Sequence, residues 1–271
     1  MEPIRPPAVA GTFYPAKPPR LRAAVETLLE GAKRSAPPPP DFPPKVIVVP
    51  HAGLPFSGPI AASAYQLLTP GPAIQRVVIL GPSHWLAFKG LALPDHRAFR
   101  TPLGDVELDL DAMTQLLEHH PDLVRVNAAA HAREHGLEVQ LPFLQTLLPA
   151  FRLVPLVVGD AQPAQVAQVL ELLWGDDATL IAISTDLSHY LSYDRAKALD
   201  GATCQAVEAL DSGTIDGAMA CGYRPLNGLL FKARRQALAI ATLDLRNSGD
   251  TAGDRRRVVG YGAWALGQQT L

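Results

Sequence analysis

The sequence predicts a single α/β domain built around a mostly parallel, mixed sheet flanked by helices. Two observations lead to this fold class. Short apolar runs rich in valine and isoleucine do not alternate with polar residues, which is typical of strands buried on both faces. Stretches with helical spacing stand between these runs, as expected where crossover helices join parallel strands.

The first elements are a helix, a loop and a strand. Residues 21–30 have helical spacing that ends at Gly31. The proline-rich segment 35–44 is too short for a domain boundary, so we expect a surface loop within one domain spanning residues 1–271. Pro50 ends the apolar run 45–49 because it has no amide hydrogen for a further ladder bond.

The remaining elements alternate along the chain. A Leu-Gly-Asp turn between extended pieces predicts a hairpin at 99–109, inserted after the second strand. Further strands are predicted at 76–80, 151–158, 179–184 and 257–266, and further helices at 59–68, 164–174 and 195–212.

Composition and charge exclude several classes of protein. The 271 residues carry 24 basic and 26 acidic side chains, a net charge of −2, so bulk charge favours neither nucleic acid nor an anionic membrane as a partner. The first residues lack an apolar core of signal-peptide length, and no run approaches the roughly 20 apolar residues that span a bilayer. We therefore expect a cytoplasmic protein.

Three of the eight histidines directly follow predicted strands. His51 follows the strand 45–49, His84 follows 76–80, and His189 follows 179–184. In an open parallel sheet the loops beyond the carboxyl ends of the strands meet at one crevice. Neutral histidine is the commonest protein ligand for transition ions, so a bound metal is the simplest reason for the three to converge.

The residues alone leave the other members of such a site open. Cys221 lies in a turn bounded by Gly222 and Pro225, and it is either a metal ligand or only a small turn residue. Cys204 lies among small apolar residues of a helix, where a buried, inert thiol is expected. Asp186 either orients a ligand or base from behind or caps the turn after its strand.

A second polar cluster occurs at 131–149. Helical spacing places Glu134, Glu138 and Leu141 on one face, with His135 beside them. These side chains either support the site from behind or form the capped, solvated start of a helix, and both readings remain open.

Seven motifs in this order resemble the Memo family, known in prokaryotes as protein B of the AmmeMemoRadiSam system. Together they extend over nearly the whole chain, which makes the resemblance far more specific than any single motif. The motifs are AGTFYP, PHAGLPFSGPIAASAY, ILGPSHW, FRTPLGDVELD, REHGLEVQLPFLQ, STDLSHY and ACGYRP.

The resemblance implies both a fold and a site. The family is similar in fold to the LigB-like class III extradiol dioxygenases, non-haem iron enzymes that open catechol rings. Carried over by motif, His51, His84 and Cys221 are implied as metal ligands and His189 as the general base, with Asp186 beside it. The dioxygenases have a carboxylate where Cys221 stands, and a thiolate makes the site softer and opens it to copper or zinc.

Three hypotheses for function follow. The first is a redox enzyme acting on an unknown small molecule with one transition metal ion, iron(II) being favoured over copper. In this hypothesis His189, hydrogen-bonded toward Asp186, takes a proton from the substrate. The second is a zinc-type hydrolase that uses the same ligands, with His189 as proton shuttle. The third is a non-catalytic module that binds the radical-SAM and AMMECR-type proteins of the same system.

Overall fold

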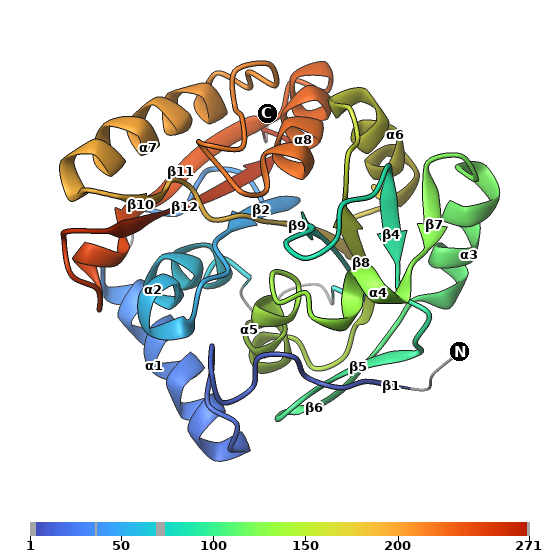
Figure 1. The fold of residues 1–271 in the computed structure, drawn as a ribbon, viewed down its shortest axis with the longest axis horizontal. Coiled ribbons are helices and arrows are strands. Elements are labelled where there is room, and N and C mark those ends of the chain that lie inside the picture. The colour runs from blue at the N-terminus through green and yellow to red at the C-terminus, as the bar shows by residue number, and fades with distance from the viewer. Residues whose placement is uncertain (1–3, 36, 69–73, 270–271) are drawn as a thin grey trace.

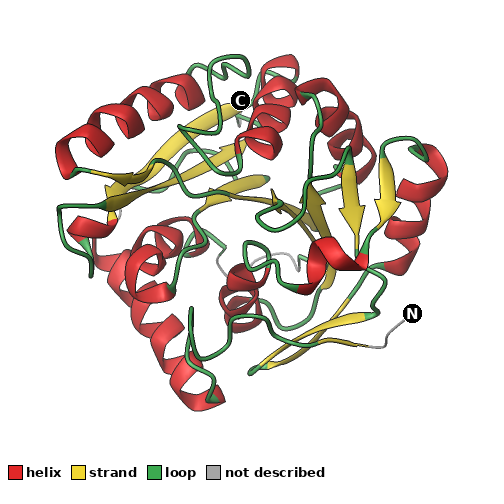
Figure 2. Ribbon diagram, in the orientation of Figure 1, coloured by secondary structure: helices red, strands yellow, loops and turns green. Residues whose placement is uncertain are grey.

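The computed structural model describes residues 4–35, 37–68 and 74–269 and contains two β-sheets (Figures 1 and 2). The larger sheet has nine strands in the order β10-β12-β2-β9-β3-β8-β4-β7, with β11 also paired to β12. The smaller has the order β1-β5-β6. The strands are β1 (Ile4–Arg5), β2 (Val46–Val49), β3 (Arg76–Pro82), β4 (Leu91–Leu93), β5 (Ala98–Thr101), β6 (Gly104–Glu107), β7 (Val124–Val126), β8 (Arg152–Val158), β9 (Thr179–Ser184), β10 (His189–Leu191), β11 (Ala239–Asn247) and β12 (Val258–Gly267).

Four parallel strands form the centre of the larger sheet. Val48 of β2 lies opposite Ile183 of β9, and β3 pairs in parallel with both β9 and β8. Antiparallel strands flank this centre, β12 beside β2 and β4 beside β8. Because the four central strands run in the same direction, the segments that follow them leave the sheet at one edge.

Helices cover both faces of the larger sheet (Figure 1). Helices α1, α2 and α5 contact one another, and α2 packs on β2, β11 and β12. On the other face α7 packs on β11 and β12, while α8 packs on β3, β9 and α6. The predicted α/β fold class, with a mixed sheet flanked by helices, is confirmed. The helices are α1 (Pro18–Ser35), α2 (Leu54–Tyr65), α3 (Leu110–His119), α4 (Ala128–Ala132), α5 (Leu141–Leu147), α6 (Pro163–Leu173), α7 (Tyr193–Glu208) and α8 (Tyr223–Arg235), with 3₁₀ turns η1 (Glu138–Gln140) and η2 (Ser248–Asp250).

Helix α1 differs from its predicted end. It continues past Gly31 to Ser35, because Ala32 beyond the glycine is buried and the last turn still packs on the protein. A single glycine weakens a helix by about 1 kcal/mol, which tertiary packing can offset. Residues 37–44 adopt neither helix nor strand, and residue 36 lies outside the described residues.

Two further segments test the predictions. The hairpin at 99–109 is confirmed as the antiparallel pair β5 and β6. The turn at Cys221 does not extend to Pro225, because α8 begins at Tyr223 and the proline lies in its first turn, where its missing amide hydrogen costs nothing. Across the part of the chain that is described, every helix is too short or too polar to cross a membrane.

Candidate metal centre

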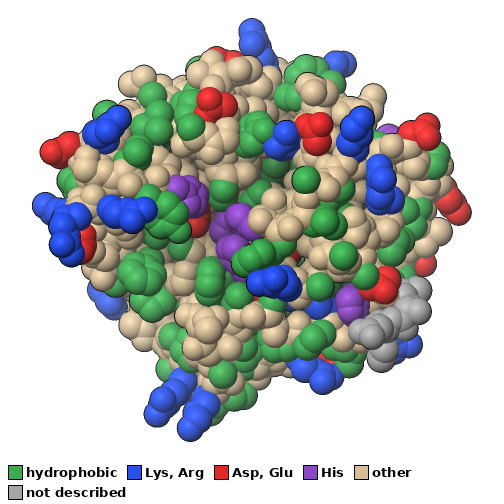
Figure 3. Space-filling view, in the orientation of Figure 1, with side chains coloured by type: hydrophobic (Ala, Val, Ile, Leu, Met, Phe, Trp, Pro, Cys, Tyr) green, Lys and Arg blue, Asp and Glu red, His purple; other side chains and the backbone are tan. Residues whose placement is uncertain are grey.

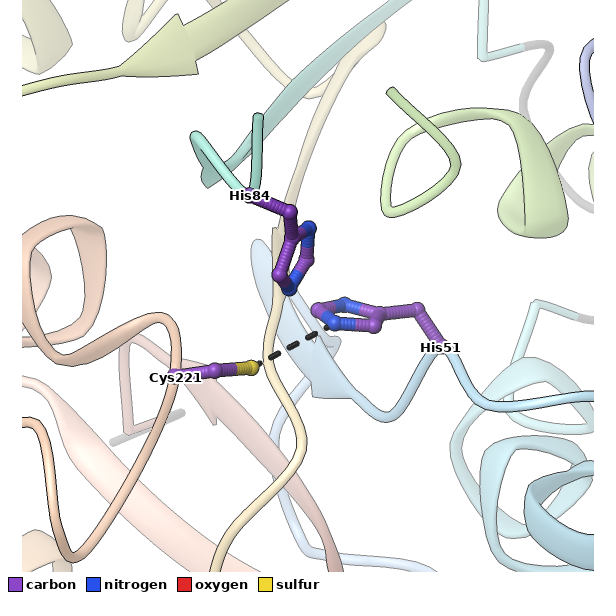
Figure 4. A group of neighbouring side chains, drawn as sticks. All are labelled: His51, His84 and Cys221. Atoms are coloured by element: carbon purple, nitrogen blue, oxygen red, sulfur yellow. Dashed lines mark hydrogen bonds between the residues drawn. The ribbon is translucent and has the colours of Figure 1, made fainter. Parts of the chain in front are cut away.

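Three predicted ligands meet at the carboxyl edge of the parallel strands. His51 follows β2, His84 follows β3, and Cys221 lies two residues before the start of α8. One nitrogen or sulfur atom from each residue lies within 4.8 Å of the others, and the three side chains point toward one another (Figure 4). Cys221 Sγ lies 3.4 Å from His51 Nε2, and the rings of His51 and His84 are nearly perpendicular, with centroids 5.1 Å apart.

Hydrogen bonds fix the tautomer of His51. The Ser184 hydroxyl donates its hydrogen to the Gly136 carbonyl at 2.5 Å and accepts one from Gln140 Nε2 at 2.9 Å. Its hydrogen is therefore committed, so the 2.9 Å contact with His51 Nδ1 requires the imidazole to donate. His51 Nε2 then carries a lone pair directed at the Cys221 thiol. Burial lowers the pKa of His51 to about 3, so this imidazole is neutral at pH 7.

Glu134 orients His84 in the same way. Its carboxylate accepts hydrogen bonds from His84 Nδ1 at 2.7 Å and from the His84 amide at 2.9 Å. The Gly136 amide donates to it at 2.8 Å. Burial raises the pKa of Glu134, but the hydrogen bonds and charge of His84 outweigh it and bring the pKa to about 2. Glu134 is thus ionised, and His84 Nε2 is left to act as a ligand.

Asp186 positions two of the three ligands. Its carboxylate accepts hydrogen bonds from the His51 amide at 2.7 Å and the Ala52 amide at 3.3 Å. Its own amide donates to Cys221 Sγ at 3.3 Å, and its carbonyl accepts from the Cys221 amide at 3.1 Å. Burial, followed by the Asp186 carboxylate, raises the pKa of the thiol to about 12. A coordinated cation would reverse this shift, because metals bind cysteine as the thiolate.

His189 lies at the same edge but has a different partner from the predicted one. Its Nδ1 donates to the Leu187 carbonyl at 2.8 Å, so the expected hydrogen bond toward Asp186 is replaced by one to the backbone. Its Nε2 is consequently the proton acceptor. The next residue, Tyr190, has φ 59°, a left-handed conformation that is strained for a bulky side chain.

The predicted helical face of Glu134, Glu138 and Leu141 does not form. Helix α4 ends at Ala132 and η1 begins at Glu138, so Glu134 lies in the loop between them. The hydrogen bonds that Glu134 makes with His84 compete with helix formation and keep this segment in a loop.

Glu138 holds the N-terminal segment in place. Its buried carboxylate forms an ion pair with the buried guanidinium of Arg5 at 2.6 Å. It also accepts hydrogen bonds from the amides of Ala8 and Val9 and from the Tyr14 hydroxyl. These contacts join segments more than 120 residues apart, so Glu138 serves the fold rather than the ligands directly.

His135 adds a second way to hold a cation at the site. Its ring stacks on His84 with centroids 4.5 Å apart, and His84, Glu134 and His135 also present atoms within 4.8 Å of one another. Burial lowers the pKa of His135 to about 4. Glu134 already accepts three hydrogen bonds with its two oxygens, so this second group suits a cation less well than the group containing Cys221.

The sequence did not indicate two residues that help to orient His51. Ser184 is the last residue of β9, and its polar side chain at the end of an apolar run was the available signal. Gln140 donates to Pro50 O as well as to Ser184, and nothing in its local sequence distinguishes it from a surface glutamine.

On the face of the molecule that carries this edge, histidine side chains gather near the centre (Figure 3). Fold and site together define an α/β protein with two imidazoles and one thiol close enough together to hold a metal ion at the carboxyl edge of parallel strands. The model of the Memo-like protein family matches residues 5–265. The chain belongs to the Memo family, as its seven motifs indicated.

Relatives support this assignment, and a solved structure has a similar fold. A MEMO1 family protein of Methanopyrus kandleri is 37% identical over 96% of this chain and 97% of its own length. One of Sulfolobus acidocaldarius is 34% identical over 95% and 97%. The crystal structure of the uncharacterized protein JW3007 from Escherichia coli K12 is 16% identical, covers 80% of this chain and 98% of that one, and has a TM-score of 0.52. That last similarity concerns the fold alone.

Proposed function

We propose that this protein is a mononuclear metalloenzyme that carries out redox chemistry on a small molecule, with iron(II) or copper held by His51, His84 and Cys221. The observation that carries the proposal is the donor set. Two imidazoles whose Nδ1 hydrogens are committed to Ser184 and Glu134 present bare Nε2 atoms next to one sulfur. Imidazole and thiolate ligands suit iron, copper and zinc rather than magnesium or calcium.

Three protein ligands leave coordination positions for a substrate or a small oxidant. When bound, the metal supplies redox and Lewis-acid chemistry at these positions. His51 is 1% exposed, whereas the side chain of His84 keeps 24% of its surface exposed, so the site is open on the side of His84. A substrate would approach from that side.

His189 is the proposed proton carrier. With Nδ1 held by the Leu187 carbonyl, Nε2 can take a proton from a substrate hydroxyl or return one to a product. The strained backbone of Tyr190 directly after it is the kind of feature that accumulates at functional sites.

Metal analysis of protein purified without oxygen tests the proposal. We expect about one iron or copper per chain in the wild type, loss of that metal in Cys221→Ser, and retention in Cys204→Ser. Cys204 is a matched control because it is a buried free thiol elsewhere in the fold, 3.6 Å from Thr242 Oγ1. Stoichiometric zinc would instead favour hydrolysis, and equal metal content in both variants would refute the ligand assignment.

A further inference from the structure

A cavity of about 610 Å³ opens beside the candidate metal centre. His84 and Cys221 form part of its wall, and the rest comes from the loop after β3, the end of β8 and the start of α8. Its size falls within the range of about 300–1,000 Å³ that is usual for small-molecule sites. Whatever occupies it lies against two of the three proposed ligands.

Two basic side chains line this cavity, and they outnumber the acidic ones. Lys89 and Arg224 contribute positive charge and Asp160 contributes negative charge, so these three groups sum to +1. The chain as a whole has a net charge of −2, so the positive charge is local to the cavity. A concave, positive wall concentrates anions.

Two contacts hold the Arg224 side chain in place, and its guanidinium has further N–H donors with which to bind a ligand. It lies three residues after Cys221, in the first turn of α8, and its NH2 donates to Asp160 Oδ1 at 2.9 Å. The guanidinium also lies over the ring of Tyr223, 4.7 Å from its centroid. Asp160 engages one nitrogen of a group with five N–H donors, and such a fork is suited to two-point recognition of a carboxylate or phosphate.

Backbone hydrogen bonds join the loop that carries Lys89 to the segment just after β8, where Asp160 lies. The Asp160 amide donates to Phe88 O at 2.7 Å, and the Gly90 amide donates to Asp160 O at 2.9 Å. Lys89 and Asp160 therefore form an isolated β-bridge, and Asp160 is the residue that accepts the hydrogen bond from Arg224. The two cations belong to one braced unit and not to independent surface loops.

We propose that this cavity is an oxyanion subsite, in which Arg224, assisted by Lys89, binds the carboxylate or phosphate group of the small-molecule substrate. The proposal deepens the proposed function and rests on it, since the metal centre supplies the reacting end of the same cavity. The substrate is then an anionic molecule that spans from Arg224 to His84 and Cys221.

Equilibrium titrations of the full-length protein with inorganic phosphate and with acetate test this subsite. Trp85 lines the cavity and is 54% exposed, so its fluorescence reports occupancy, and calorimetry provides a second readout. We expect saturable binding of at least one anion by the wild type and at least tenfold weaker binding by Arg224→Gln. Arg224→Lys keeps the charge and should recover part of the affinity. Tighter binding of phosphate indicates a phosphate ester as substrate, and tighter binding of acetate indicates a carboxylate.

Arg235→Gln is the matched control, because Arg235 is an exposed arginine at the other end of α8. Arg224→Gln should fold normally, since the ion pair that it loses is partly exposed and such pairs add little stability. Absence of saturable binding by the wild type, or equal weakening in both variants, would overturn the proposal. Repeating the titrations after chelation separates the two ideas. Anion binding that persists after chelation supports the subsite, whereas the metal content of the protein as purified decides the metalloenzyme proposal.

Discussion

Replacing Glu134 with glutamine tests how the protein prepares His84 as a ligand. Glu134 is 2% exposed in the wild type, and its carboxylate accepts hydrogen bonds from the His84 ring, the His84 amide and the Gly136 amide. Glutamine keeps one acceptor oxygen and turns a donor NH2 toward a site built only of donors. If the amide oxygen keeps the contacts with the ring and Gly136, the bond to the His84 amide is lost.

The expected loss can be estimated from these contacts. A hydrogen bond to a charged group contributes about 1.5–3 kcal/mol, so the metal-free variant should be destabilised by about 2 kcal/mol in denaturant unfolding. Disturbing the group that orients a metal-bound histidine typically lowers metal affinity by about 10–100-fold. A competition titration against a chelator of known affinity measures this directly.

Glu138→Gln provides the contrast. It breaks a buried ion pair with Arg5, which should cost about 3–5 kcal/mol of stability, while leaving metal affinity within about twofold. Unchanged metal affinity in Glu134→Gln, or an equal loss in both variants, would refute the reasoning that Glu134 acts on His84 specifically.

Three further predictions follow from the same contacts. Burial lowers the pKa of His131 from its usual value near 6.5 to about 4. Its contribution to stability is therefore complete above pH 6.5 and is lost as the pH falls toward 4. Unfolding measured between these pH values should show that the wild type loses up to about 3 kcal/mol that His131→Gln does not lose. In Gly222→Ala the new Cβ would lie 2.8 Å from Ser184 O, so we expect about 1–3 kcal/mol of destabilisation and weaker metal binding. Gly201→Ala, with open space in a helix, should be neutral or stabilising. Wild-type stability and metal affinity in Gly222→Ala would show that this approach is not tight. His189→Ala should keep its metal and lose turnover once a substrate is found, and loss of metal would make His189 a ligand instead.

Much of the fold could be predicted because its central strands have simple patterns. The apolar runs of β2, β3, β8 and β9 are buried on both faces, and this burial is what removes polar alternation from a sequence. The flanking elements were harder. The three-residue strands β4 and β7 are too short for any periodicity, and β1 has two residues.

Helix α8 was hidden by residues that usually interrupt helices. Pro225 is tolerated in the first turn, and Gly228 is required inside the helix because a Cβ there would lie 2.3 Å from Val166 of α6. Both residues are explained only by position and packing. Neither is visible in the local sequence as a sign of helix.

The candidate ligands were easier to predict than the residues that orient them. His51 and His84 lie where parallel strands must end, so strand prediction alone places them together. Cys221 lies 170 residues beyond His51. Its turn alone left two readings open, and the resemblance to a family motif favoured the ligand. The partners of Asp186 depend on which amide and thiol approach it in three dimensions, and the hydrogen bond expected from His189 goes to the Leu187 carbonyl instead.

X-ray absorption spectroscopy of the zinc-loaded protein tests the central claim most directly, because it counts sulfur and nitrogen neighbours of the metal. The account predicts one sulfur at about 2.3 Å and imidazole nitrogens at about 2.0–2.1 Å. The sulfur shell should disappear in Cys221→Ser and remain in Cys204→Ser. A spectrum without sulfur in the wild type, or an unchanged spectrum in Cys221→Ser, would contradict a centre formed by His51, His84 and Cys221.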